Sequence, residues 1–272
     1  GFNSESGHYY DPITSFLGFG PTILSRDNPE HKRLVHSLID SSVAGPFQHF
    51  PWKNRASAVN TLATCLTILM RNGFLSTSPI IPITAYMPRT GKSMLMSTIV
   101  GVTTKESVGA KNMPSSDDEA NKMFFAALRG GENIIALDNL KDGVRVDSPP
   151  LAQLSTAFHY SGRVLGHSEN AKVINKATVF LTGNNVILSG ELSKRSLPIE
   201  LKPENDRPHE RVLPNIKEVI AEHGDDTNHL LHGMVQAWVE AGSPKGSAGL
   251  FGGFEDWDEV ISGVMEFWGF GA

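Results

Sequence analysis

Between residues 80 and 201 the chain alternates short apolar segments with helical ones, and this alternation constrains the fold more than any other feature. The expected strands are 80–85, 133–137, 177–182 and 196–201, and the expected helices are 92–100, 117–129 and 149–159. Strands that alternate with helices form a parallel sheet with helices on its faces. The sequence therefore predicts an α/β fold with a central, mostly parallel sheet flanked by helices.

Helical segments are expected on both sides of this region. The run Asn28-Pro29-Glu30 has a capping side chain, a proline at the first helical position and an acid in the first turn, which together predict a helix start. Further helices are expected over 52–71, 212–222 and 227–241, with a last amphipathic helix from about Phe254. The predicted parts are an irregular and helical lead-in (1–78), the α/β core (79–203) and a C-terminal helical region (204–272).

The composition of the 272 residues leaves the function open. The net charge of −5 argues against a surface that is basic overall, although it allows a narrow pore lined by a few cations. The longest apolar stretch, 56–70, contains polar residues and is shorter than the ~20 residues of a membrane span, so a buried helix and no membrane contact are expected. Cys65 is the single cysteine, which predicts a reducing, cytoplasmic setting. The start at Gly1 rather than Met predicts a fragment or a processed form of a longer protein.

The sharpest local signal is the run Tyr86-Met87-Pro88-Arg89-Thr90-Gly91-Lys92-Ser93, which follows an expected strand and opens an expected helix. Its Gly-Lys-Ser core fits the phosphate-binding loop in the strand–loop–helix setting that this motif requires. Backbone N–H groups would surround the phosphates, Lys92 would reach the β and γ oxygens, and the Ser93 hydroxyl would bind Mg²⁺. The residues expected to contact ATP are Pro88, Arg89, Thr90, Gly91, Lys92, Ser93 and Met94. Tyr86 replaces the usual first glycine, at a position that shapes the start of the loop without supplying chemistry.

Three further polar residues follow, each next to an expected strand. Asp138 ends a buried strand at the carboxyl edge of the sheet, where it can face Mg²⁺ bound to Ser93. Asn184 ends the next strand and can hold the attacking water near the γ-phosphate. Arg195 precedes the last strand, a point from which an arginine of a ring ATPase reaches the γ-phosphate of the neighbouring subunit. Each also has a simpler explanation, as a strand end, a turn or a surface arginine, and Gly-Lys-Ser can occur by chance in a strand–helix turn.

In this order and spacing the four elements resemble the AAA+ and superfamily 3-like P-loop ATPases, in particular the helicase-like proteins of phages and mobile elements that often accompany primase domains. The runs that carry the resemblance are 88–93, 137–140 (Leu-Asp-Asn-Leu), 162–169, 182–185 (Thr-Gly-Asn-Asn), 190–195 and 254–257. The resemblance covers roughly Ser37 to the C-terminus, which is most of the chain. The resemblance implies that 79–203 is a P-loop ATPase core, that Mg²⁺ and ATP bind there, and that a hexameric ring moves along DNA during replication. It also implies a prokaryotic host and a primase or origin-binding domain in the full-length protein.

Asn139 departs from the wider superfamily, in which a carboxylate at this position activates water. The mobile-element group often has Asp-Asn here, so hydrolysis is still expected. Two other carboxylates, Glu132 and Asp142, lie nearby in the sequence, but their spacing identifies neither as the base.

Residues 162–176 alternate apolar and polar side chains around a polar turn, which predicts a β-hairpin with strands at 163–165 and 173–175. In related ring helicases a hairpin before the asparagine strand projects into the central pore. By that resemblance Arg163, His167 and Lys172 are candidates for contact with the backbone of single-stranded DNA, and such contact would weaken as salt rises. The alternative is a solvated hairpin in which Arg163 pairs with Glu169.

The leading hypothesis is therefore the ATP-driven motor of a DNA helicase or translocase. A second hypothesis is a nucleotide-switched module, such as a helicase loader, in which turnover is incidental. A third is a small-molecule kinase that uses the same loop, but such an enzyme has no use for an arginine that acts on a neighbouring subunit.

Overall fold

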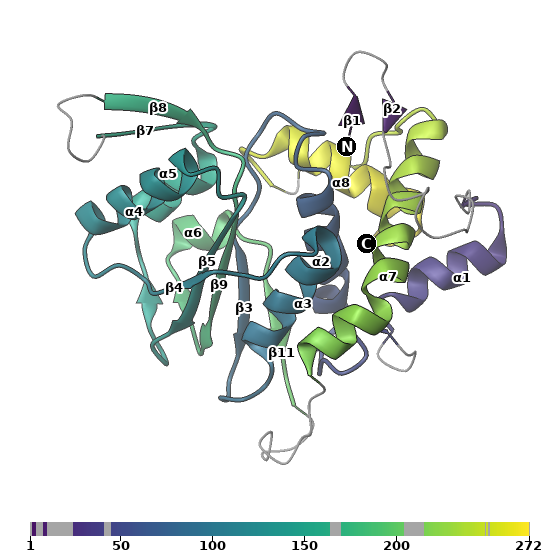
Figure 1. The fold of residues 1–272 in the computed structure, drawn as a ribbon, viewed down its shortest axis with the longest axis horizontal. Helices are drawn as coiled ribbons and strands as arrows, with labels where there is room; N and C mark the ends of the chain where they lie inside the picture. Colours follow the sequence, from purple (N-terminus) through teal and green to yellow (C-terminus); the bar gives the residue numbers. More distant parts are fainter. Residues whose placement is uncertain are drawn as a thin grey trace.

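A computed structural model gives the fold, which is built on five parallel strands (Figure 1). The structure describes residues 2–3, 8–9, 24–40, 45–163, 170–203, 215–247, 249 and 251–271. The order across the sheet is β11 (Ile199–Leu201), β3 (Ile81–Ala85), β9 (Thr178–Asn184), β5 (Ile134–Leu140) and β4 (Ala110–Lys111). The predicted α/β fold with a parallel sheet between helices is confirmed. The sheet also contains β4, whose two residues carry no apolar run that the sequence could reveal.

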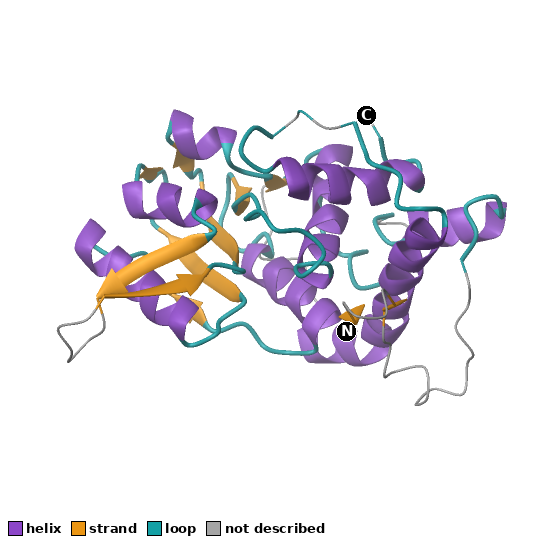
Figure 2. Ribbon diagram, turned by 90° about the horizontal axis from the view of Figure 1, so that it is seen from above, coloured by secondary structure: helices purple, strands orange, loops and turns teal. Residues whose placement is uncertain are grey.

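Helices cover the sheet on both sides (Figure 2). Their bounds are α1 (Pro29–Ser37), α2 (Arg55–Leu69), α3 (Lys92–Thr104), α4 (Asp117–Arg129), α5 (Pro149–Thr156), α6 (Gly190–Lys194), α7 (Ile216–Glu240) and α8 (Glu255–Phe267). Three short pairs lie outside the main sheet: β1 (Phe2–Asn3) with β2 (His8–Tyr9), β6 (Arg145–Val146) with β10 (Ile187–Leu188), and β7 (His159–Arg163) with β8 (Asn170–Ile174). Of the helices that the structure describes, none is long and apolar enough to cross a membrane.

The strands distribute their side chains between two hydrophobic cores, one on each face of the sheet. On β5, Ile135 and Leu137 belong to the core shared with α4 and α5, whereas Ala136 belongs to the core shared with α2 and α3. Successive side chains of a strand point to opposite faces. The same alternation brings Asp138 at the end of β5, and Asn184 at the end of β9, to the side on which α3 begins.

The core on the α3 side joins all three parts of the chain. It contains Leu62 of α2, Ile83 of β3, Leu95 of α3, Leu231 of α7 and Trp257 of α8, each with at most 3% of its surface exposed. Burial of this kind stabilises by about 1.5–3 kcal/mol for each large apolar side chain. The lead-in and the C-terminal helices therefore share a core with the strand that precedes the candidate phosphate loop.

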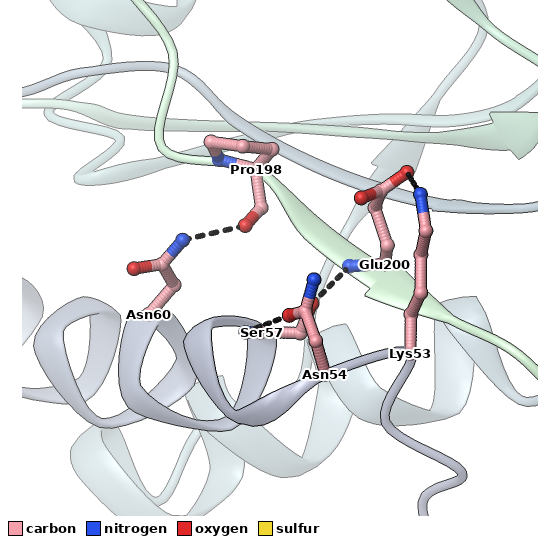
Figure 3. A network of polar contacts seen from close by, with 6 residues as sticks. All are labelled: Lys53, Asn54, Ser57, Asn60, Pro198 and Glu200. Carbon is pink, nitrogen blue, oxygen red and sulfur yellow. Dashed lines mark hydrogen bonds and ion pairs between the residues drawn. The ribbon is translucent and has the colours of Figure 1, made fainter.

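The outer edge of β11 is covered by the chain that leads into α2 (Figure 3). Lys53 donates its backbone N–H to the Glu200 carbonyl at 2.9 Å, and its ammonium pairs with the Glu200 carboxylate at 2.8 Å. The Ser57 hydroxyl accepts from the Glu200 N–H at 3.1 Å, and the Asn60 amide donates to the Pro198 carbonyl at 2.7 Å. These contacts satisfy polar groups that an edge strand would otherwise leave open, and they fix α2 against the sheet.

Two expectations for helices were wrong. Residues 216–240 form one helix of 25 residues, α7, rather than two helices separated near Gly224. Its contacts with α3 explain the continuity, because Asp225 pairs with Lys105 at 2.6 Å and the Asn228 amide donates to the Val102 carbonyl at 2.9 Å. Tertiary contacts of this kind outweigh the low helix propensity of a glycine.

Helix α5 ends at Thr156 instead of continuing to residue 159. A residue distant in sequence, Asn175, accounts for this end. Its buried amide donates to the carbonyls of Leu154 (2.6 Å) and Ala157 (3.1 Å). These carbonyls at the end of the helix therefore have a partner other than a further helical turn. His159 instead begins strand β7.

Candidate functional site

The loop between β3 and α3 leaves the first N–H groups of α3 open. Gly91 precedes the helix with a φ of 96°, and no side chain caps this end. Arg89 is also left-handed, with a φ of 59°. By contrast, the starts of α4 and α5 are capped by the side chains of Ser116 and Ser148. An uncapped helix start next to left-handed loop residues directs N–H groups and the positive end of the helix dipole toward an anion.

Lys92 lies folded over this loop. Its ammonium donates to the Asn184 side-chain oxygen at 2.6 Å, to the Thr90 hydroxyl at 3.2 Å and to the Met87 carbonyl at 3.3 Å. Partial burial lowers the pKa of Lys92, and the negative charges of Asp138 and Asp142 oppose that shift. The structure thus places a half-buried cation between the candidate phosphate loop and the end of β9.

Asp138 reaches the same place from the end of β5. Its Oδ1 accepts a hydrogen bond from the Ser93 hydroxyl at 2.7 Å and another from the Thr182 hydroxyl. Thr182 also accepts from the backbone N–H of Asn139 at 3.0 Å. The carboxylate is therefore held against the first turn of α3 by residues of two different strands.

The four predicted residues of the carboxyl edge thus lie together, in two bonded pairs, Lys92 with Asn184 and Ser93 with Asp138. The sheet order explains this arrangement, because β9 lies between β3 and β5 and brings Asn184 between the loop and the acid. Open parallel sheets bind their ligands at the carboxyl ends of the strands.

Tyr86, at the position of the missing glycine, causes no backbone conflict. Tyr86 has 44% of its surface exposed, and it is not among the residues with a positive φ in the part of the chain that the structure describes. Glycine is favoured where φ is positive or where space is short. The start of this loop therefore accommodates a large side chain.

Arg195 lies away from this group, at the amino edge of the sheet. Its carbonyl accepts from the Ile80 N–H at 2.9 Å, just before β3 begins. Its guanidinium pairs with Glu191 at 2.5 Å and donates to the Ala152 carbonyl at 3.1 Å. Because β3 separates Arg195 from the phosphate loop, a role for this side chain at a γ-phosphate requires the site of a second copy.

The predicted hairpin is present, but its strands β7 and β8 begin earlier than expected and pair Arg163 with Asn170 and Ser161 with Lys172. Gly162 lies so close to Phe125 of α4 that an added Cβ would be 2.3 Å from the ring. Tyr160 donates to the Asn121 side chain at 2.7 Å, and burial raises the pKa of Tyr160 to about 12. One face of the hairpin is therefore fixed to α4.

The opposite face of the hairpin is open to solvent. Its six exposed residues are His159, Ser161, Arg163, Asn170, Lys172 and Ile174. None of them is acidic, so the two predicted cations, Arg163 and Lys172, give this face a positive charge. The third candidate, His167, lies outside the described residues.

The comparisons with known proteins add no family, because no protein-family model and no curated protein matches the chain. Among the residues that the structure describes, no three His, Cys, Asp or Glu side chains are grouped to hold a metal ion.

Residues that sequence reasoning missed include Thr182, which supports Asp138, and Asn185, which joins two of the loops. Both residues lie in the run 182–185 that carries the resemblance, but that run assigned a role to Asn184 alone.

Proposed function

We propose that this chain binds Mg²⁺ and ATP at the carboxyl edge of its sheet and hydrolyses the nucleotide. The observation that carries the proposal is the contact of Lys92 with Asn184 and of Ser93 with Asp138 beside the uncapped start of α3. A strand, a loop with Gly-Lys-Ser and a helix are the context in which this motif binds phosphates.

Each residue then has a role that follows from its chemistry. The open N–H groups of α3 bind phosphate oxygens. Lys92 exchanges its hydrogen bond with Asn184 for one with the β and γ oxygens. The freed amide of Asn184 then orients the attacking water, since it lies 2.6 Å from the ammonium that would hold the γ-phosphate.

The side chains near Asp138 fit Mg²⁺. Ser93 and Asp138 offer a hydroxyl and a carboxylate whose oxygens are 2.7 Å apart, and Mg²⁺ is usually held by one or two carboxylates together with waters and substrate phosphates. When bound, the ion neutralises charge on the phosphates. Ser93 and Asp138 are therefore the residues that would hold it.

A ring of identical subunits, most simply a hexamer, accounts for the position of Arg195. Its guanidinium contacts α5 and Glu191 of its own chain, at the edge opposite the nucleotide. An arginine supplied by a neighbouring subunit stabilises the charge of the transition state. Hydrolysis would then depend on assembly.

The charge of the hairpin supports the proposal that this motor moves along DNA. The open face of the hairpin is cationic, and only Asn175, Lys176 and Ala177 separate β8 from β9, the strand that ends in Asn184. Strand β9 thus connects the hairpin, whose open face is suited to phosphodiester contact, with Asn184, the residue that is hydrogen-bonded to Lys92. We therefore favour a DNA helicase or translocase motor of a phage or mobile-element replication protein.

A helicase loader or another nucleotide-switched assembly module is the second candidate. Asn139 favours it, because an amide follows Asp138 where a base would otherwise lie, and its φ of 57° coincides with the register shift of β5 between Leu137 and Leu140. Such a module would bind ATP and associate with a separate helicase while turning over slowly.

The test is a steady-state ATPase assay with and without single-stranded DNA, together with the mass of the oligomer in the presence of nucleotide. The motor predicts turnover that DNA stimulates and a ring mass of several subunits. Tight ATP binding with negligible turnover under all conditions would favour the loader. Absence of Mg²⁺-dependent ATP binding would contradict both.

A further inference from the structure

The hydrolysis proposed above needs a group that accepts a proton from the attacking water, and the residue after Asp138 is an amide. The Asn139 side chain is neutral and cannot serve as the base. Two carboxylates act on Lys92 through their charge, Asp138 and Asp142. Asp138 already accepts hydrogen bonds from Ser93 and Thr182, which leaves Asp142.

The side chain of Asn185 holds Asp142 beside the phosphate loop. The Asn185 amide donates to the Asp142 carboxylate at 2.8 Å and to the Tyr86 carbonyl at 3.2 Å. The Asn185 N–H also donates to the Ala85 carbonyl at 2.9 Å. The chain segments that follow β3, β5 and β9 therefore meet at Asn185.

The backbone conformation of Asn185, where the three segments meet, is energetically unfavourable for a residue other than glycine. Its φ of 48° is left-handed, a conformation that non-glycine residues adopt rarely and that surrounding contacts must support. Asn184, the residue before it, contacts Lys92, and the Asn184 carbonyl accepts from the Gly143 N–H at 3.1 Å. The loop that carries Asp142 is thus bonded to both asparagines, and the Asp142 side chain is exposed to water.

We propose that Asp142 is the general base of this ATPase and that Asn185 is its positioning residue, an inference that rests on the proposed function. The water oxygen forms a bond to the γ-phosphorus while the bond from that phosphorus to the bridging oxygen breaks. The bridging oxygen leaves with the electron pair as part of ADP. The proton of the water passes to the Asp142 carboxylate and then to solvent.

The test is Asp142→Asn, because an asparagine oxygen can still accept from Asn185 but cannot take the proton. We expect the kcat for ATP to fall about 100-fold, with the Kd for Mg²⁺–ATP within threefold of the wild-type value. The matched control is Asp147→Asn, which alters another exposed aspartate on the other side of the short strand β6 and should leave kcat unchanged. Asn185→Ala should lower kcat less than Asp142→Asn while retaining nucleotide binding.

If the wild-type chain hydrolyses ATP and Asp142→Asn turns over within threefold of it, the assignment of the base is wrong while the proposed function stands. An equal loss in Asp142→Asn and Asp147→Asn would also overturn the assignment. If the wild-type chain does not bind Mg²⁺–ATP, the proposed function itself fails, and the inference fails with it.

Discussion

At the carboxyl edge of the sheet the candidate catalytic side chains contact one another within one chain, whereas at the amino edge they contact other parts of the fold. Lys92, Ser93, Asp138 and Asn184 form bonded pairs around an uncapped helix start. Arg195 is instead held by Glu191 and α5, and the cations of the hairpin face solvent. Under the proposed function, one subunit suffices for nucleotide binding, while hydrolysis and movement need a neighbouring subunit and DNA.

The largest expected effect on ATP turnover comes from a substitution at the carboxyl edge of the sheet. Lys92→Ala should abolish ATP turnover and weaken ATP binding, because it removes the cation placed between the loop and Asn184. Phosphate release and equilibrium nucleotide binding measure the two losses. The control is Lys105→Ala, which removes a lysine just beyond the other end of α3, where it pairs with Asp225. Equal activity in the two variants would remove the phosphate-loop assignment.

Arg195→Ala tests whether the amino edge acts on a second copy. We expect kcat to fall about 10³-fold with ATP binding retained, as for other arginines that a neighbouring subunit supplies. Mixing this variant with Lys92→Ala protein should restore part of the turnover, because some interfaces then combine an intact loop with an intact arginine. Lys194→Ala is the control. Failure of every mixture to recover activity would argue against a shared site.

Neutralising Arg163 and Lys172 together tests the open face of the hairpin. DNA-stimulated ATPase should fall roughly tenfold, and the dependence of log affinity on log salt should become shallower by about two. Basal ATPase should stay the same, since both side chains lie on the solvent face of the hairpin. An equal loss of basal and stimulated activity would place these residues outside the DNA path.

The smallest effect on turnover is expected for Gly162→Ala, which tests the docking of the hairpin on α4. The added methyl would overlap the Phe125 ring, so the free energy of unfolding should drop by about 1–3 kcal/mol, as measured by denaturant titration. Basal ATPase should change little, whereas stimulation by DNA should weaken. Gly109→Ala, at an exposed site with nothing within 4 Å of an added Cβ, should be neutral for both properties.

Two helices that share one core, α4 and α5, differ in how well the sequence predicts them. Helix α4 was predicted at both ends, because Ser116 caps its start and Gly130 follows its last residue. Helix α5 was predicted too long, because the contact that ends it comes from Asn175, which is distant in sequence. Local signals therefore define an element well only when its ends are determined locally.

The same distinction applies to the site. The meeting of Lys92, Asp138 and Asn184 could be predicted, since the carboxyl ends of neighbouring parallel strands lie at one edge. The support that Thr182 gives to Asp138 depends on the register between β5 and β9. The bond between Asn185 and Asp142 depends on a left-handed turn. Thr182 and Asn185 both lie in the run 182–185, but that run does not reveal these contacts, so neither contact was expected.

A structure of the chain crystallised with Mg²⁺ and a non-hydrolysable ATP analogue tests the central claim most directly. The account predicts that the phosphates lie against the loop before α3, that Lys92 has left Asn184 for the γ-phosphate, and that Mg²⁺ is bound by Ser93 on the side of Asp138. Nucleotide bound elsewhere, with Lys92 still on Asn184 at saturating analogue, would contradict it.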